Sequence, residues 1–420
     1  MSITNASHWS AQFATRKFAR RAEPAPAAAA RERAFDWFLA HGLPSLHDED
    51  WKYTDVRAIA ARAWRTTDPS GCDTAALRAT GVLDLIPHRL VFVNGHWNPK
   101  ISTPAPDGIR VSPIGETPEP FSDSVPPADG FAALNIALAD EGMLIEARTG
   151  AAASLHIVYV TGAAPDMIAN LRHAVIVAPG ATLDLIETHM ALDDRDCLSN
   201  QLMQIEVGAG AVLRHWQLGL GGDGARRIAR TAVKVARDAR YESTLVTLGG
   251  RLTRGSDEIT LAQGAACAVH GLRVARGREH VDHQLRIVHA APDTRSRTAI
   301  RSIVDDAART VVSARVVVER GARGADAQQQ LRNLLLSPGA EADTRPQLEI
   351  YADEVQCSHA ATTGNLDPEA LYYLRTRGLD AGSARAALIR AFAEDIVSGI
   401  ALEALRQLID ARLHERLRKN

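Results

Sequence analysis

The segment "VAPGATLDLIE" at residues 177–187 is one of four similar phrases, and their repetition decides the fold. The others are "VGAGAVLRHWQL" at 207–218, "LAQGAACAVHGLRV" at 261–274 and "LSPGAEADTRPQLEI" at 336–350. Each phrase places Gly-Ala before an alternating strand, and glycine can take the positive φ that a tight corner requires. We predict that four glycines lie at such corners: Gly180, Gly210, Gly264 and Gly339.

The spacing of these phrases predicts a parallel β-solenoid with one phrase per coil. Successive copies lie roughly 26 to 30 residues apart over much of the region, a spacing at which repeat architectures occur. Short alternating strands dominate from about 141 to 355, and stacked coils would pair their edges. An antiparallel sandwich stays open as the alternative, although the hairpin dipeptides that it needs are scarce here.

The sequence divides into three parts around this core. Residues 1–140 are a helical and mixed region, with a helix from about residue 23 to 41 that buries Phe35, Phe38 and Leu39. An Asn94-Gly95 hairpin follows in the same region. Residues 141–363 form the solenoid, and residues 364–420 form a helical domain. The protein is therefore expected to be mainly β, with helices at both ends.

The carboxyl-terminal part carries apolar stripes at helical spacing. Asp367-Pro368 is a helix start, because aspartate caps a helix and proline suits its first position. A second helix begins near Ser383, and its Leu388, Phe392 and Ile396 stand four residues apart. These stripes must be buried against the solenoid, each other or a partner.

Composition narrows the class of protein. The 420 residues are 46% hydrophobic, 23% charged and 5% aromatic, with a formal net charge of -2, so no global positive field attracts nucleic acid or an anionic membrane. No apolar run approaches the roughly 18 residues of a membrane-spanning helix. The cysteines are widely spaced, as expected for reduced thiols in the cytoplasm: Cys72, Cys197, Cys267 and Cys357.

The first 22 residues are basic, with Arg16, Lys17, Arg20 and Arg21 and no acidic residue. This composition fits an organelle transit peptide, but a basic amphipathic helix docked on the body is the favoured interpretation.

Motifs for phosphate binding and serine hydrolysis are absent, so we expect neither ATP hydrolysis nor hydrolase chemistry from this chain.

Cys357 and His359 lie two apart on a predicted strand, so their side chains share a face and could meet a borderline metal. Such a pair is incomplete without ligands from another chain, and a buried structural thiol is the alternative for Cys357. His280, His283 and His289 also invite a metal interpretation, but hydrogen-bonded structural histidines are favoured there.

One long run closely resembles a known family. "LLLSPGAEADTRPQLEIYADEVQCSHAATTGNLD" at 334–367 is similar to the carboxyl-terminal signature of the SufB/SufD family of iron–sulfur cluster assembly subunits, and of its SufD branch in particular. "HVDHQLRIVH" at 280–289 and "DEDWKYTDV" at 48–56 resemble further segments of that branch. A SufB-type chain would be longer and carry an amino-terminal cysteine cluster. The family usually has glycine where this chain has Ala360, and strain is expected there if the position needs positive φ.

The resemblance implies a right-handed parallel β-helix and a non-catalytic scaffold subunit that pairs with a SufB-like subunit. An ABC ATPase resembling SufC would bind the carboxyl-terminal helices. Removing these helices would abolish binding of the ATPase without unfolding the solenoid. The candidate contacts there are Tyr372, Leu388, Phe392 and Ile396.

By the same resemblance, His359 would be a metal ligand shared with the SufB-like subunit at a nascent iron–sulfur cluster, with Cys357 beside it. The isolated chain would bind no cofactor, and ATP would enter only through the ATPase. Two alternatives stay open: a carbohydrate-active β-helix enzyme using carboxylates such as Glu187, and a free-standing structural homodimer.

Overall fold

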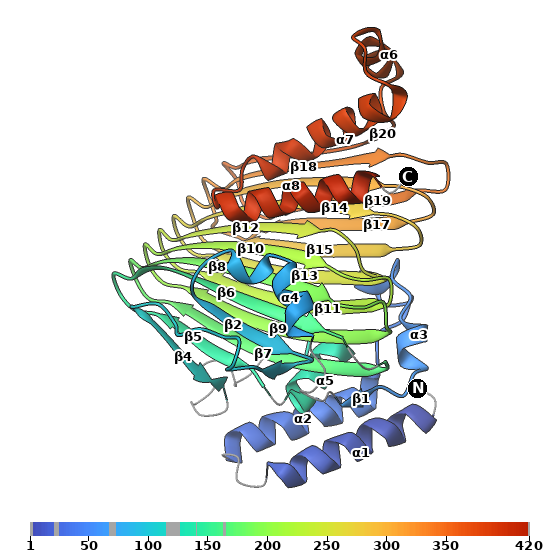
Figure 1. Cartoon of the computed structure of the whole chain (residues 1–420). Helices are drawn as coiled ribbons and strands as arrows, with labels where there is room; N and C mark the ends of the chain where they lie inside the picture. Colours follow the sequence, from blue (N-terminus) through green and yellow to red (C-terminus); the bar gives the residue numbers. More distant parts are fainter. Residues whose placement is uncertain are drawn as a thin grey trace.

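Two stacked sheets form the body of the protein in the computed structural model, which describes residues 3–20, 25–66, 73–114, 127–139, 141–162 and 165–418. Cys72 and Arg21 lie outside the described residues. The sheets wind into a parallel β-solenoid of about 7 turns (Figure 1). The prediction of a solenoid is confirmed, and the antiparallel sandwich was wrong.

Sheet A contains the odd-numbered strands except β3, together with β4 (Ile109–Pro113) at one end. In spatial order the others are β5 (Met143–Ala147), β7 (Met167–Val177), β9 (Cys197–Val207), β11 (Ala225–Val235), β13 (Leu252–Leu261), β15 (His280–His289), β17 (Arg309–Val318) and β19 (Glu341–Ile350). The short β1 (Arg65–Thr66) pairs with β7.

Sheet B contains the even-numbered strands except β4. In spatial order they are β2 (Arg89–Val93), β6 (Ala152–Thr161), β8 (Thr182–Ala191), β10 (Val212–Leu220), β12 (Arg240–Thr247), β14 (Ala266–Ala275), β16 (Arg295–Val304), β18 (Asp326–Leu335) and β20 (Gln356–Gly364), with β3 (His96–Trp97) beyond β2. Because β2 pairs in parallel with β6, the sheets begin before residue 141.

All four predicted glycines lie at corners, but glycine is required at Gly339 for a different reason than at the other three. Gly180, Gly210 and Gly264 have φ values of 70°, 65° and 69°, in the left-handed region that favours glycine. Gly339 also lies at a corner, but its φ is not positive. A Cβ atom there would lie 2.7 Å from the carbonyl oxygen of Asp306, so close backbone approach is what requires glycine. Ala360 has no positive φ either, so the expected strain is absent.

Apolar side chains fill much of the solenoid interior in columns, one residue per coil. Leu183, Leu213 and Tyr241 occupy one such column of sheet B and are buried. At about 25 cal/mol per Å² of apolar surface, this stacking is the main stabilising contribution to the fold.

The amino-terminal helices cover the outer face of sheet A. They are α1 (Ile3–Ala19), α2 (Ala25–His41) and α5 (Gly130–Leu138). Phe13 stacks on Phe35 at 4.2 Å, as the docked-helix interpretation expects. α2 confirms the predicted helix, and Phe35 and Phe38 are buried, but Leu39 is 43% exposed and was wrongly assigned to the buried face.

The connecting segments of this region are short. They comprise η1 (Glu49–Trp51), α3 (Arg57–Ala60), α4 (Thr74–Ala79) and η2 (Val82–Asp84). The Asn94-Gly95 hairpin between β2 and β3 is confirmed, with both residues at positive φ.

Three helices follow the solenoid: α6 (Pro368–Thr376), α7 (Ala381–Val397) and α8 (Glu403–Arg418). Asp367 caps α6, since its carboxylate accepts from the Glu369 amide at 2.9 Å. α7 and α8 pack on the outer face of sheet B, whereas α6 stands away from the body (Figure 1). None of the described helices has the length and apolar character to span a membrane.

Candidate functional site: the open end of the solenoid

The solenoid ends with two unpaired strand edges. β19 pairs with β17 and β20 pairs with β18, and no described strand lies on the other edge of either one. Both strands are the last in their sheets, at the end of the body from which α6 projects (Figure 1). An exposed edge presents unpaired N–H and C=O groups, so it is a template for pairing with another chain.

The hydrogen bonds fix which residues face the open edge. The Gln356 amide donates to the carbonyl of Ala325 at 2.8 Å, so even-numbered residues of β20 face β18. Backbone groups alternate along a strand, so the amides of Cys357, His359 and Ala361 face outward. On β19 the Tyr351 amide donates to Val318, so the even-numbered residues face outward there. Pro346 is one of them, and the edge of β19 therefore lacks one donor at its centre.

Cys357 and His359 share a face, as predicted. Cys357 aligns with Ala327 and His359 with Gln329, both buried on the interior face of the preceding coil. The two side chains therefore form the last rung of the interior. His359 is exposed and Cys357 is partly buried, and burial raises the pKa of the Cys357 thiol. A raised pKa disfavours the thiolate, the form that binds metal. Among the described residues, no three potential ligands gather in a metal-binding arrangement, so this pair needs ligands from elsewhere.

α6 is the second exposed feature of this end. None of its residues is buried, and the Tyr372 side chain is 71% exposed. On α7, Leu388 and Phe392 are half-buried, but Ile396 lies in the apolar contact between α7 and sheet B. Ile396 is therefore a packing residue of this chain, and the prediction that it contacts a partner is corrected.

The three histidines of β15 have structural contacts. His280 bonds with the Thr54 hydroxyl at 3.0 Å, and His289 bonds with Thr294 at 2.8 Å. His283 bonds with the Asp257 carboxylate at 2.8 Å. Each ring thus has a partner within the fold, as the structural interpretation expects.

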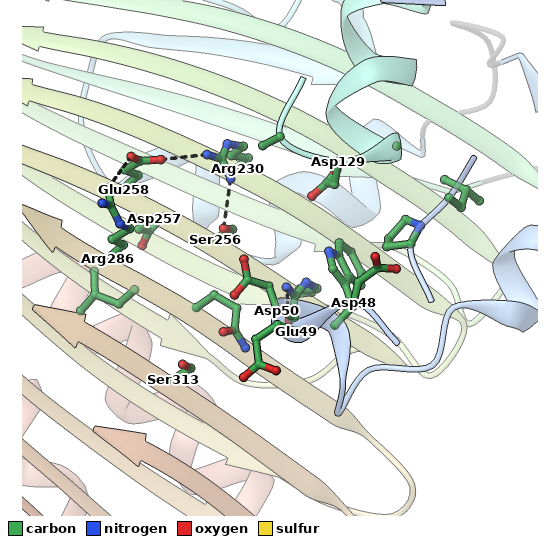
Figure 2. A pocket seen from close by; sticks show the side chains of 18 of the residues that line it. Asp48, Glu49, Asp50, Asp129, Arg230, Ser256, Asp257, Glu258, Arg286 and Ser313 are labelled. Carbon is green, nitrogen blue, oxygen red and sulfur yellow. Dashed lines mark hydrogen bonds and ion pairs between the residues drawn. The ribbon is translucent and has the colours of Figure 1, made fainter. Parts of the chain in front are cut away.

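A groove that sequence reasoning missed lies on the outer face of sheet A, beneath the loop that follows α2 (Figure 2). Its volume is about 500 Å³, and on its floor Arg230 and Arg286 each donate to Glu258 at 2.9 Å. Both guanidinium groups are thus already paired with a carboxylate of this chain, that of Glu258. The loop and strands that form the groove are far apart in sequence, which is why no local signal revealed it.

A buried polar cluster inside the solenoid was also missed. Glu187 accepts from His215 at 2.5 Å, and both side chains are buried between the sheets. Despite its burial, the neighbouring His215 and His189 hold the pKa of Glu187 well below its usual range. Glu187 is therefore a residue of the solenoid interior and not of its surface. Of the large aromatic side chains that the structure describes between residues 141 and 355, only Tyr351 is exposed, so an aromatic sugar platform is missing there.

Fold and site together define a class of protein: a parallel β-solenoid with an open pairing edge, helical extensions at both ends and a Cys-His rung at the end of its interior.

The family follows from comparison with known proteins. Residues 159–392 match the family described as "SUF system FeS cluster assembly, SufBD core domain", and residues 10–150 match the "SufBD protein N-terminal region". The chain is 31% identical over 390 residues to iron-sulfur cluster assembly protein SufD of Escherichia coli (strain K12), covering 90% of each chain.

Two further relatives are designated iron-sulfur cluster assembly SufBD family proteins. One from Synechocystis is 29% identical over 408 residues, covering 91% of this chain and 90% of the relative. One from Mycobacterium leprae is 36% identical over 191 residues, covering 43% and 49%. This chain belongs to the SufBD family of iron–sulfur cluster assembly proteins, and its similarity is of the SufD type.

Proposed function

We propose that this protein is a non-catalytic scaffold subunit of a cytoplasmic iron–sulfur cluster assembly complex, in which it pairs with a SufB-like subunit and binds a SufC-like ATPase. The single observation that carries the proposal is the pair of open strand edges at the end that holds His359. Membership of the SufBD family indicates the process, iron–sulfur cluster assembly, and the open strand edges offer a surface for pairing with another chain.

The SufB-like partner would extend both sheets across the open end. Strand addition joins chains through backbone hydrogen bonds, so it needs an edge free of competing groups. β20 offers outward amides at Cys357, His359, Ala361 and Thr363, and the absent donor at Pro346 restricts the partner's register on β19.

The nascent cluster is the cargo of this interface. His359 would complete an iron site begun by thiolates of the partner, because a neutral imidazole is a good ligand for iron and is exposed on the last rung. Cys357 has a supporting role, since its raised pKa keeps the thiol protonated. A site shared between two chains opens when the chains separate, so its cargo is exchangeable.

The ATPase would bind α6 and the adjacent exposed side of α7. Tyr372 is exposed on α6, and Leu388 and Phe392 lie half-buried on α7. Deleting residues 365–420 is a poor test of this contact, because α7 and α8 bury the outer face of sheet B and their loss would uncover Trp216 and Leu272. Single substitutions on α6 leave that packing intact.

Co-purification tests the assembly as a whole. Tagged full-length chain, expressed with SufB-like and SufC-like subunits of the same genome, is expected to recover both partners. Tyr372→Ala should reduce ATPase recovery at least several-fold, as is common for an exposed aromatic anchor, and leave the SufB-like subunit bound. Phe18→Ala is the matched control, because Phe18 is a comparably exposed aromatic residue on α1, away from both α6 and the open strand edges. Recovery of neither partner with the wild-type chain would refute the proposed function.

A further inference from the structure

The imidazole ring of His359 has no hydrogen-bond partner or ion-pair partner among the described residues. The side chain is exposed on the last rung of the solenoid interior, so the ring can turn and either nitrogen can carry the proton. A ligand for iron needs one bare nitrogen directed at the metal. In metal sites the other ring nitrogen usually donates its proton to a carbonyl or a carboxylate, which fixes both the tautomer and the ring.

One buried carbonyl beneath His359 has no donor. Gln329 on β18 aligns with His359 on β20, so the two side chains occupy adjacent rungs of the same interior column. Neighbouring strands lie about 4.8 Å apart, a separation that long side chains can bridge. Gln329 is only 3% exposed, and its side-chain oxygen Oε1 is one of the buried polar atoms that lack a partner among the described residues. An unsatisfied buried acceptor is unfavourable.

The other end of the Gln329 amide is fixed. Its NH₂ group donates to the backbone carbonyl of Ala314 on β17, at 3.3 Å across the interior. Turning the amide over would place two carbonyl oxygens against each other, so Oε1 is the end that stays free. On the preceding coil the column contains Thr298, whose hydroxyl is also without a partner and so does not reach Gln329. The column therefore leaves His359 as the neighbouring donor.

We propose that Gln329 is the positioning residue of His359. One ring N–H of His359 donates to Oε1 of Gln329, which leaves the second ring nitrogen bare and directed at the open end. This inference rests on the proposed function, in which that nitrogen binds iron.

Pairing with the partner is the event that enforces this bond. In the isolated chain the exposed ring can bond to water instead. A partner that covers the open end removes that water, and the donor and the acceptor on adjacent rungs then satisfy each other. Docking thus orders the ligand when the shared cluster site forms.

Two variants of the full-length chain in the assembled complex test this role. Gln329→Met keeps a similar length and volume but removes the acceptor, whereas Gln329→Glu keeps an acceptor oxygen in the same place. Gln329→Met should lower the chelator concentration that removes half of the cluster by about tenfold or more, the usual effect of losing such a partner. Gln329→Glu should restore most of the resistance to the chelator.

The tautomer of His359 gives a second readout, which does not depend on the cluster. In the cluster-free complex, with nitrogen-15 histidine in this chain alone, NMR signals of the ring are assigned by difference against His359→Asn. The wild type should show a single neutral tautomer, and Gln329→Met should show both, with the complex recovered in equal amount. Thr298→Val is the matched control and should change neither measurement, because it removes a buried, unpartnered hydroxyl on the far side of Gln329.

The possible failures are distinguishable. Wild-type resistance to the chelator and a single His359 tautomer in Gln329→Met would overturn the positioning role, and the proposed function would stand. A Thr298→Val variant that loses as much resistance as Gln329→Met would overturn it too, because the effect would then be one of interior packing. If His359→Ala also keeps its full cluster, the proposed ligand fails and the positioning role fails with it.

Discussion

Replacing Ala361 by proline tests whether the edge of β20 is the pairing surface. The Ala361 amide faces the open edge, so proline removes one outward donor and leaves the ladder between β18 and β20 complete. In the pairing proposed above, the partner loses one backbone hydrogen bond and keeps a carbonyl unsatisfied. The expected loss is about 1 to 2 kcal/mol, a factor of roughly 5 to 30 in the dissociation constant.

The neighbouring alanine provides the control. The Ala360 amide faces β18, so Ala360→Pro breaks the ladder within the chain and should increase hydrogen exchange of the β20 amides in the isolated protein. Ala361→Pro should leave that exchange unchanged and weaken binding of the SufB-like subunit, measured by titration calorimetry. Unchanged affinity for the Ala361→Pro variant, with β20 still protected, would refute pairing through this edge.

Three further outcomes follow from the packing and the buried charges. Ile389→Ala should lower the free energy of unfolding by about 3 kcal/mol, because Ile389 is buried between α7 and sheet B, whereas Leu388→Ala should cost clearly less; equal losses in chemical denaturation would contradict this packing. Gly180→Ala should cost about 1 kcal/mol, because φ is 70° and no atom would meet the new Cβ. Gly364→Ala, whose φ is not positive, should be nearly neutral in the same measurement. Burial lowers the pKa of His189 to about 4, below its unfolded value near 6.5, so this histidine stabilises the fold above pH 6.5 and that stability is lost as pH falls toward 4. The slope is up to about 1.4 kcal/mol per pH unit, and a His189→Gln variant with the wild-type pH profile would exclude this contribution.

Local signals predicted much of the architecture. The corner glycine Gly180, the Asn94-Gly95 hairpin and the Asp367 cap each depend on a few adjacent residues, and each has the predicted conformation. The spacing between the Gly-Ala phrases predicted the coil length, because each coil stacks in register on its neighbour and equivalent corners recur once per coil.

Side-chain partners between coils could not be predicted in this way. Arg227 meets Gln217 across the interior, and which inward positions of the two sheets face each other depends on the stagger between coils. The stripe on α7 was misplaced for a related reason: residues spaced strictly by four drift around a helix of 3.6 residues per turn. Leu388 is therefore only partly covered, and Ile389, Ala393 and Ile396 form the line that packs on sheet B.

Cluster yield from the assembled complex with His359→Ala tests the central proposal most directly. If His359 is a ligand, the variant should assemble with both partners and support normal ATP hydrolysis, but form markedly less iron–sulfur cluster by absorbance and iron content. His359→Asn separates this role from a hydrogen bond across the interface, because an amide can restore pairing but is a poor iron ligand. Full cluster yield from His359→Ala, with complex recovery and ATP hydrolysis unchanged, would contradict the account.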